Sequence, residues 1–138
     1  MTDSETKIEI RSLYKIFGDK PQAMMEKVRA GIGKDQLNEE FGHVLGLSDI
    51  NLKIPARGIQ VVMGLSGSGK STLIRHINRL IEPTSGDVIV DGENVISMDD
   101  KALRDFRRNR ASMVFQKFAL LPHRTVMDNT IYGLEIQG

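Results

Sequence analysis

One short stretch constrains the fold of this chain more than any other. Residues 64–72 read Gly-Leu-Ser-Gly-Ser-Gly-Lys-Ser-Thr, so Gly64, Gly69, Lys70 and Ser71 satisfy the pattern G-x-x-x-x-G-K-[ST]. Glycines let the backbone curl so that successive N–H groups point at phosphate oxygens, and a following helix presents its positive dipole end to the same anion. The lysine of this pattern reaches the β- and γ-phosphates, and the hydroxyl group coordinates Mg²⁺. The stretch therefore predicts a loop that binds a nucleoside triphosphate, with ATP and Mg²⁺ as the ligands.

A phosphate-binding loop of this kind lies between a buried strand and a helix, and the residues on either side of it have these two patterns. Ile59 to Met63 form a short apolar run, typical of a strand that is buried on both faces. From Lys70 to Ile81 the apolar residues recur at helical spacing. We therefore expect a strand, the phosphate-binding loop and a helix over residues 59–81. A flexible surface loop is the alternative.

Two further strands are expected before the loop. Polar and apolar residues alternate over 7–13, and apolar residues return at strand spacing over 45–54. Between them, Pro21 can open a helix, and Met24, Met25 and Val28 recur at helical spacing. Residues 20–43 are therefore predicted to be a small insertion of one or two helices.

The sequence pattern of the second half of the chain predicts a hairpin, a strand and two helices. Apolar runs at 87–90 and 93–96 flank Asp91-Gly92, which favours a hairpin turn. Ser97 with Asp100, and Thr125 with Asp128, resemble capping boxes with Asp in place of Glu. We expect one helix from the first of these to about Asn109 and another near the end of the chain. Residues 111–116 read as a short strand that ends at Gln116.

Composition excludes several classes of function. The chain has 138 residues, a formal net charge of +1 and no cysteine. A nearly neutral chain offers no electrostatic footprint for nucleic acid, and the missing cysteine excludes disulfides and thiolate chemistry. The apolar runs are too short to span a bilayer, and the acidic first ten residues are unlike a signal peptide. We expect a cytosolic protein whose membrane association comes through a partner.

Several other groups are interpreted as structural. Asp99 and Asp100 could pass for paired carboxylates, but their place at a helix start favours capping. His43, His76 and His123 are scattered without metal-ligand spacing. The arginines between 104 and 110 are best explained as a solvated helix face, although a nucleic-acid patch is the alternative.

The motifs together resemble the ATPase subunits of ABC transporters. Residues 64–72 are similar to their Walker A motif, and residues 81–86 with the hairpin are similar to the lead into their antiparallel β-subdomain. Residues 113–116 resemble the strand that ends in their Q-loop glutamine, and the match continues to Asn129. The insertion and the runs 78–84 and 115–123 are most similar to the ATP-binding subunits of glycine betaine/L-proline importers.

The resemblance implies a fold and a set of residue roles. The fold is an α/β P-loop NTPase core, incomplete, with an N-terminal antiparallel β-subdomain and a small helical insertion, and residues 1–138 would be the N-terminal part of one nucleotide-binding domain. Lys70 neutralises phosphate charge, Ser71 and Gln116 complete the Mg²⁺ site, and Gln116 also senses the γ-phosphate. Phe17 is expected to stack on adenine; Tyr14 is the alternative, and core packing is the other interpretation of either ring. The backbone that wraps the phosphates is formed by Gly64, Leu65, Ser66, Gly67, Ser68, Gly69, Lys70, Ser71 and Thr72.

The family also needs motifs that this sequence lacks. No Leu-Ser-Gly-Gly-Gln signature, no apolar strand ending in Asp-Glu and no switch histidine is found, and in the family these follow the Q-loop helices. Without a carboxylate that orients water, the residues present could hold a nucleotide but should hydrolyse it poorly. We therefore expect the N-terminal portion of a longer ATPase.

The resemblance finally implies a function and partners. The intact protein would energise an importer of glycine betaine or proline by binding and hydrolysing ATP. It would pair with a second copy of itself and a transmembrane permease, with a substrate-binding protein indirectly, at the cytoplasmic face of the membrane. A non-hydrolytic nucleotide-binding fragment, an ATPase for a different solute such as an amino acid, and a small-molecule P-loop kinase are the alternatives.

Overall fold

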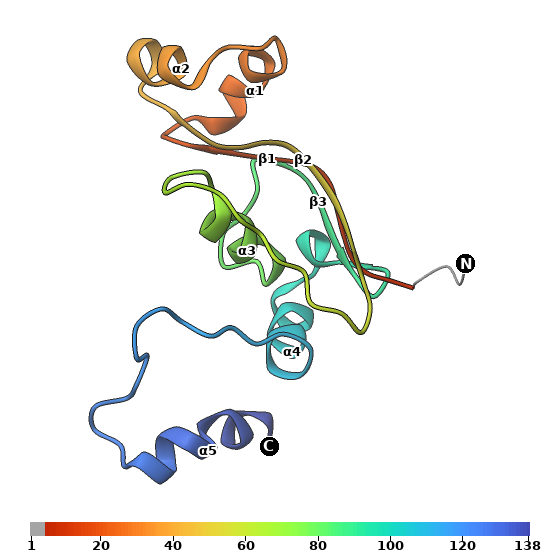
Figure 1. Ribbon diagram of the computed structural model, residues 1–138, viewed down its shortest axis with the longest axis vertical. Helices are drawn as coiled ribbons and strands as arrows, with labels where there is room; N and C mark the ends of the chain where they lie inside the picture. Colours follow the sequence, from red (N-terminus) through yellow and green to blue (C-terminus); the bar gives the residue numbers. More distant parts are fainter. Residues whose placement is uncertain (1–4) are drawn as a thin grey trace. The chain divides into compact units, whose positions relative to one another are not determined.

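The computed structural model describes residues 5–138, which fall into two compact units (Figure 1). The first unit ends at Ser97, and the second runs from Met98 to Gly138. Each unit is described by itself below. The assignment of the whole chain to one nucleotide-binding domain stays a prediction.

The first unit is built on a four-stranded antiparallel sheet with the order β2-β1-β3-β4. Its first strand keeps the alternating pattern beyond residue 13, because Leu13 and Ile16 are both buried and bulges reset the register between them. The antiparallel β-subdomain predicted from the sequence is thereby confirmed. The strands are β1 (Thr6–Phe17), β2 (Val44–Pro55), β3 (Ser85–Val90) and β4 (Glu93–Asn94).

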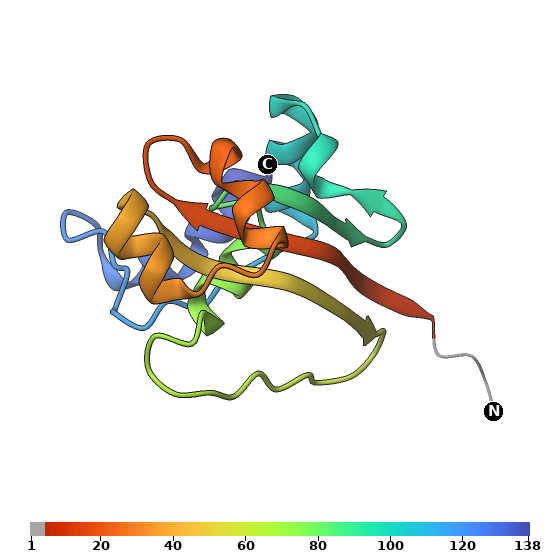
Figure 2. The same cartoon turned by 90° about the horizontal axis from the view of Figure 1, so that it is seen from above.

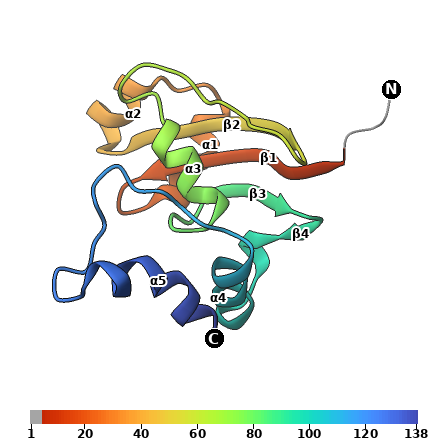
Figure 3. The same cartoon turned by 60° about the horizontal axis from the view of Figure 1, so that its bottom comes forward.

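Helices cover both faces of this sheet. α1 (Pro21–Arg29) and α2 (Lys34–Phe41) lie on one face, and α3 (Lys70–Ile77) lies on the other (Figures 2 and 3). The helical insertion predicted for residues 20–43 is therefore formed, with Pro21 at the start of α1. It is fixed to the sheet by an apolar cluster of Ile16, Met25, Val28, Leu37 and Leu45.

The helix after the phosphate-binding loop is shorter than predicted. α3 ends at Ile77 rather than Ile81, because Arg79 adopts a left-handed conformation with φ of +53°. The Arg79 side chain supports this turn: its Nε donates to Glu82 Oε1 at 2.7 Å and its Nη1 to the Val95 carbonyl at 3.3 Å. The turn then leads the chain into β3.

Two predicted strands are not formed. Neither residues 59–63 nor residues 111–115 are assigned to a strand, and no described residue forms a ladder with them. Their apolar side chains are largely exposed, with 95% for Ile59, 86% for Met63 and 99% for Val114. A strand of this kind is stabilised by neighbours that pair with it and cover both faces, and residues 5–138 supply no such neighbours.

The hairpin forms as predicted but is shorter on its return side. Asp91 and Gly92 both have positive φ, which suits the tight turn that matches sheet twist. β4 ends at Asn94, and Val95–Ser97 form a short 3₁₀ turn, η1, instead of continuing the strand. The reason is local: Asn94 Oδ1 accepts from the N–H of Ile96, and Ser97 Oγ donates to the Asn94 carbonyl.

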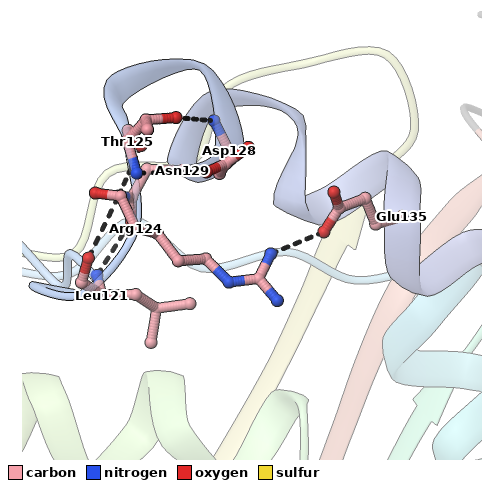
Figure 4. A network of polar contacts seen from close by, with 6 residues as sticks. All are labelled: Leu121, Arg124, Thr125, Asp128, Asn129 and Glu135. Carbon is pink, nitrogen blue, oxygen red and sulfur yellow. Dashed lines mark hydrogen bonds and ion pairs between the residues drawn. The ribbon is translucent and has the colours of Figure 1, made fainter.

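The second unit contains α4 (Asp100–Asn109) and α5 (Val126–Gln137). The first is capped by Asp99, whose Oδ1 accepts from the N–H of Ala102 at 2.8 Å, so the prediction of Ser97 as the cap was wrong. The capping box of Thr125 and Asp128 is confirmed, because each side chain accepts from the other residue's N–H at 3.1 Å. Figure 4 shows this cap, with the Asn129 amide joined to both backbone groups of Leu121.

Candidate nucleotide-binding site

The first unit contains a pocket at the meeting point of its sheet, its insertion and the phosphate-binding loop. Its volume is about 370 Å³. Phe17 ends β1, Lys34 opens α2, and residues 44–46 begin β2. The other wall is the loop and the first turn of α3, formed by Gly67, Gly69, Lys70, Ser71 and Thr72. Residues widely separated in sequence thus share one pocket.

The loop takes the curled shape that its glycines permit. Gly67 and Gly69 have φ of +77° and +95°, a region in which a side chain is strained. The N–H of Ser68 donates to the Leu65 carbonyl at 3.2 Å, which closes a turn. A Cβ on Gly69 would lie 2.9 Å from the carbonyl oxygen of Gly46, so this glycine also lets the loop approach β2. The loop is therefore held against the sheet at the pocket wall.

Lys70 lies across the loop. Its Nζ donates to the Leu65 carbonyl at 2.7 Å and to Ser68 Oγ at 3.3 Å. Gly69, the N-cap of α3, supplies no side-chain acceptor for the first-turn N–H groups of the helix. Such N–H groups and the helix dipole favour an anion. The Lys70 ammonium group and the start of α3 thus lie at the same wall of the pocket, an arrangement that favours the binding of a phosphate group.

Phe17 is the aromatic residue that faces this pocket. The residue is 38% exposed, and Lys15 Nζ lies 5.1 Å from the centroid of its ring. A Cβ on Gly46 would lie 2.6 Å from Phe17 Cε2, so the ring packs directly on the backbone of β2. Tyr14 instead packs against the apolar cluster under the insertion. This favours Phe17 over Tyr14 as the adenine-stacking residue.

The two residues predicted to bind magnesium, Ser71 and Gln116, belong to different units. Ser71 lines the pocket and is exposed, whereas Gln116 lies in the second unit. Within residues 5–138 no group of three or more His, Asp or Glu side chains could hold a metal ion. Mg²⁺ commonly uses one or two protein ligands with substrate phosphates and water, so a hydroxyl beside a phosphate loop fits it. The joint site of Ser71 and Gln116 stays a prediction.

Four sequence-predicted residues of the loop, Gly64, Leu65, Ser66 and Ser68, do not line this pocket. Gly64, Leu65 and Ser66 are exposed, and Gly64 instead allows the close approach of Ser68, whose Oγ would lie 2.6 Å from an added Cβ. Four lining residues, Lys34, Val44, Leu45 and Gly46, were not anticipated. No sequence signal points to them, because their position depends on how the insertion and β2 pack.

His76 supports the loop from inside the first unit. Its side chain is fully buried, and Nδ1 donates to the Thr72 carbonyl at 2.7 Å, which leaves Nε2 without a hydrogen-bond partner among the described residues. Burial is the main cause that lowers the pKa of His76, and the nearby Lys15 cation acts in the same direction. The His76 imidazole is therefore held neutral within α3, the helix that follows the loop.

The family model for the ABC transporter matches residues 47–137 of this chain. The chain belongs to the ABC transporter family. Membership in this family implies nucleotide binding. The G-x-x-x-x-G-K-[ST] pattern of residues 64–71 forms the loop at the pocket described above. The mixed α/β architecture with its antiparallel sheet is a partial ABC ATPase fold, as predicted.

Curated relatives include ATP-binding proteins of osmolyte transport systems. The chain is 51% identical over 132 residues to the glycine betaine/proline betaine transport system ATP-binding protein ProV of Escherichia coli, covering 96% of this chain and 33% of ProV. It is 46% identical to the glycine betaine transport ATP-binding protein OpuAA of Bacillus subtilis, covering 96% and 32% respectively. The chain thus spans about a third of the length of these relatives.

Solved structures agree on the fold. A dimeric ATP-binding cassette in a post-hydrolysis state, bound to ADP and Pi, superposes with a TM-score of 0.73 at 27% identity, covering 95% of this chain and 48% of that cassette. None of the described helices is long and apolar enough to cross a membrane.

Proposed function

We propose that this chain is the N-terminal nucleotide-binding part of an ABC importer's ATPase subunit, and that the importer carries glycine betaine or proline-type osmolytes. The observation that carries the proposal is the pocket that brings the aromatic Phe17 together with Lys70 and the loop. The 46–51% identity to osmolyte ATP-binding proteins over 96% of the chain supports the solute.

The nucleotide would be ATP, with adenine stacked on Phe17 and the β- and γ-phosphates in the loop. Lys70, now bonded to the Leu65 carbonyl, would turn its ammonium to the phosphates. The first-turn N–H groups of α3 would donate to the same oxygens. Ser71 would bind Mg²⁺, and Gln116 would complete the ion's environment and report the γ-phosphate.

Transport needs further partners. A second copy of the ATPase would close over the bound ATP, and hydrolysis would reopen the pair and drive a permease through alternating access. Exposed apolar side chains of the second unit support a permease contact: Phe118 is 93% exposed, and Leu120, which is 63% exposed, lines a pocket of about 430 Å³ together with Pro122 and Val126. A substrate-binding protein would act indirectly, and the subunit would lie peripherally at the cytoplasmic face of the membrane.

Calorimetric titration of the chain with ATP, with and without Mg²⁺, tests this function. We expect ATP binding, and we expect Lys70→Ala to weaken it at least tenfold because the phosphates lose their main cation. Lys101→Ala, an exposed lysine in the second unit, is the matched control and should bind as the parent chain does. Equal ATP affinity in all three proteins would refute the proposal.

Turnover distinguishes the role of this chain from that of the intact subunit. We expect the 138-residue chain to bind ATP without efficient phosphate release, since its sequence contains no apolar strand that ends in Asp-Glu, the pair that orients the attacking water in the family. In the intact subunit, Lys70→Ala should abolish ATP-driven uptake. Normal uptake by that variant would contradict the assignment.

A different solute is the second candidate. Residues of this chain are 50% identical over 95 residues to the methionine import ATP-binding protein MetN of Desulfitobacterium hafniense, covering 69% of this chain and 28% of MetN. Uptake assays with labelled glycine betaine, proline and methionine, in cells whose only importer uses the intact subunit, discriminate the two. Methionine uptake without betaine uptake would favour the amino-acid alternative.

A further inference from the structure

The helical insertion reaches the nucleotide pocket. α1 and α2 lie before residue 47, outside the part of the chain that the family model matches. Lys34, the first residue of α2, nevertheless lines the pocket together with Phe17 and Lys70. An element outside the region that the family model matches thus contributes a charged side chain to the pocket.

Packing fixes the rotation of α2, and so the position of Lys34. Leu37, three residues further on, is fully buried in the cluster with Leu45 of β2. Residues three apart lie on neighbouring parts of a helix surface. Since Leu37 is locked against the sheet, Lys34 is held at the pocket end of the helix.

The two ends of the insertion are also tied together. The buried His43 accepts the N–H of Lys20 on Nε2 at 3.2 Å and bonds the Phe41 carbonyl through Nδ1 at 2.5 Å. Because Nε2 accepts, Nδ1 carries the proton and donates. A side chain on Gly18 would run into the His43 ring, with Cγ only 2.7 Å from an added Cβ. The two ends of the insertion, at Lys20 and His43, are therefore joined by a hydrogen bond.

We propose that Lys34 binds the phosphate chain of the nucleotide from the insertion side of the pocket, at the phosphate nearest the ribose. This proposal rests on the proposed function. The residues lining the pocket carry two ammonium groups, Lys34 and Lys70, and no carboxylate. Lys34 forms no ion pair with a carboxylate in the described part of the chain.

The position of the two cations decides which phosphate each one meets. Lys70 belongs to the loop that takes the β- and γ-phosphates. Lys34 enters with Phe17 and Val44, at the strand ends where adenine would stack. A lysine ammonium is a compact, strongly hydrated point charge, better suited to an anion than to the adenine ring. The α-phosphate lies between these two ends of the nucleotide.

Titration of the 138-residue chain with ATP, ADP and adenosine tests this inference. We expect Lys34→Ala to weaken ATP and ADP about two- to fivefold each, the range of an exposed charge pair, and to leave adenosine unchanged. Lys34→Glu should weaken both nucleotides further, Lys34→Arg should restore most of the affinity, and 0.5 M salt should reduce the difference from the parent chain. Lys20→Ala, in the same insertion but outside the pocket, is the control.

The outcomes separate the inference from the proposed function. If the parent chain binds ATP and Lys70→Ala does not, while Lys34→Ala matches Lys20→Ala, the inference is wrong and the function stands. If Lys34→Ala weakens adenosine as much as ATP, the contact is not to phosphate and the inference is wrong. If the parent chain and Lys70→Ala bind ATP equally, the proposed function itself fails. Circular dichroism of each variant verifies that the fold is retained.

Discussion

Gly86, the second residue of β3, offers the sharpest test of how the sheet is assembled. It has φ of +101°, and an added Cβ would lie 2.7 Å from the Arg11 carbonyl oxygen and from Leu13 Cα, and closer still to the Ser12 carbonyl oxygen. These are backbone atoms of β1, so no rotamer change relieves the overlap. Gly86→Ala must therefore either strain the backbone of β3 or separate β1 from β3.

The cost of Gly86→Ala has two parts. A left-handed conformation costs an L-residue about 1–2 kcal/mol, and overpacking against atoms that cannot rotate away costs about 1–3 kcal/mol more. We expect a loss of about 2–5 kcal/mol in the free energy of unfolding, a large share of a small domain's stability. Urea denaturation followed by circular dichroism measures it.

Gly92→Ala is the matched control for this experiment. Gly92 also has a positive φ, +80°, but an added Cβ there would meet nothing within 4 Å. Only the conformational part of the cost applies, about 1–2 kcal/mol. If Gly86→Ala is no more destabilising than Gly92→Ala, the close approach of β1 and β3 at Gly86 is wrong.

Other variants test the site, the buried histidine and the second unit. Gly46→Ala should push the Phe17 ring aside and weaken ATP binding severalfold with little change in melting temperature, and it should have no effect in a Phe17→Ala background. Because burial lowers the pKa of His76, the folded state favours the neutral ring. The contribution of His76 to the free energy of unfolding should therefore be fully present above pH 6.5 and should fall below that pH by at most about 1.4 kcal/mol per pH unit. Urea denaturation at several pH values should find a smaller slope for His76→Gln. The Thr125 hydrogen bonds hold the pKa of Asp128 below its ordinary value, so Thr125→Ala should raise that pKa in a carboxyl NMR titration, and an unchanged value would refute the capping box as its cause.

Local chemistry explains the features that sequence predicted well. Curling of the loop depends on its own glycines, the turn at Asp91-Gly92 on two positive φ values, and the start of α5 on a side chain three residues away. In each case the residues that carry the sequence signal lie within a few positions of the structure that they cause. Two local caps competed at α4: the prediction of Ser97 was wrong, whereas the capping role expected of Asp99 is confirmed. The predicted return strand was cut short because Asn94 bends the chain into a 3₁₀ turn.

Features that depend on distant partners were decided by the tertiary structure alone. The apolar runs at 59–63 and 111–115 carry strand character, but a strand exists only where another pairs with it, and residues 5–138 provide no partner. The nucleotide pocket has the same dependence. The glycines and Lys70 are enough to predict a phosphate-binding loop from the sequence. Phe17, Gly46 and Lys34, in contrast, lie beside this loop only because β1, β2 and α2 pack around a shared apolar cluster. The sequence by itself thus determined the curled, glycine-rich loop that is predicted to bind phosphate. The packing of the sheet and insertion decided what surrounds this loop, because side chains distant along the chain converge only through the burial of apolar surface.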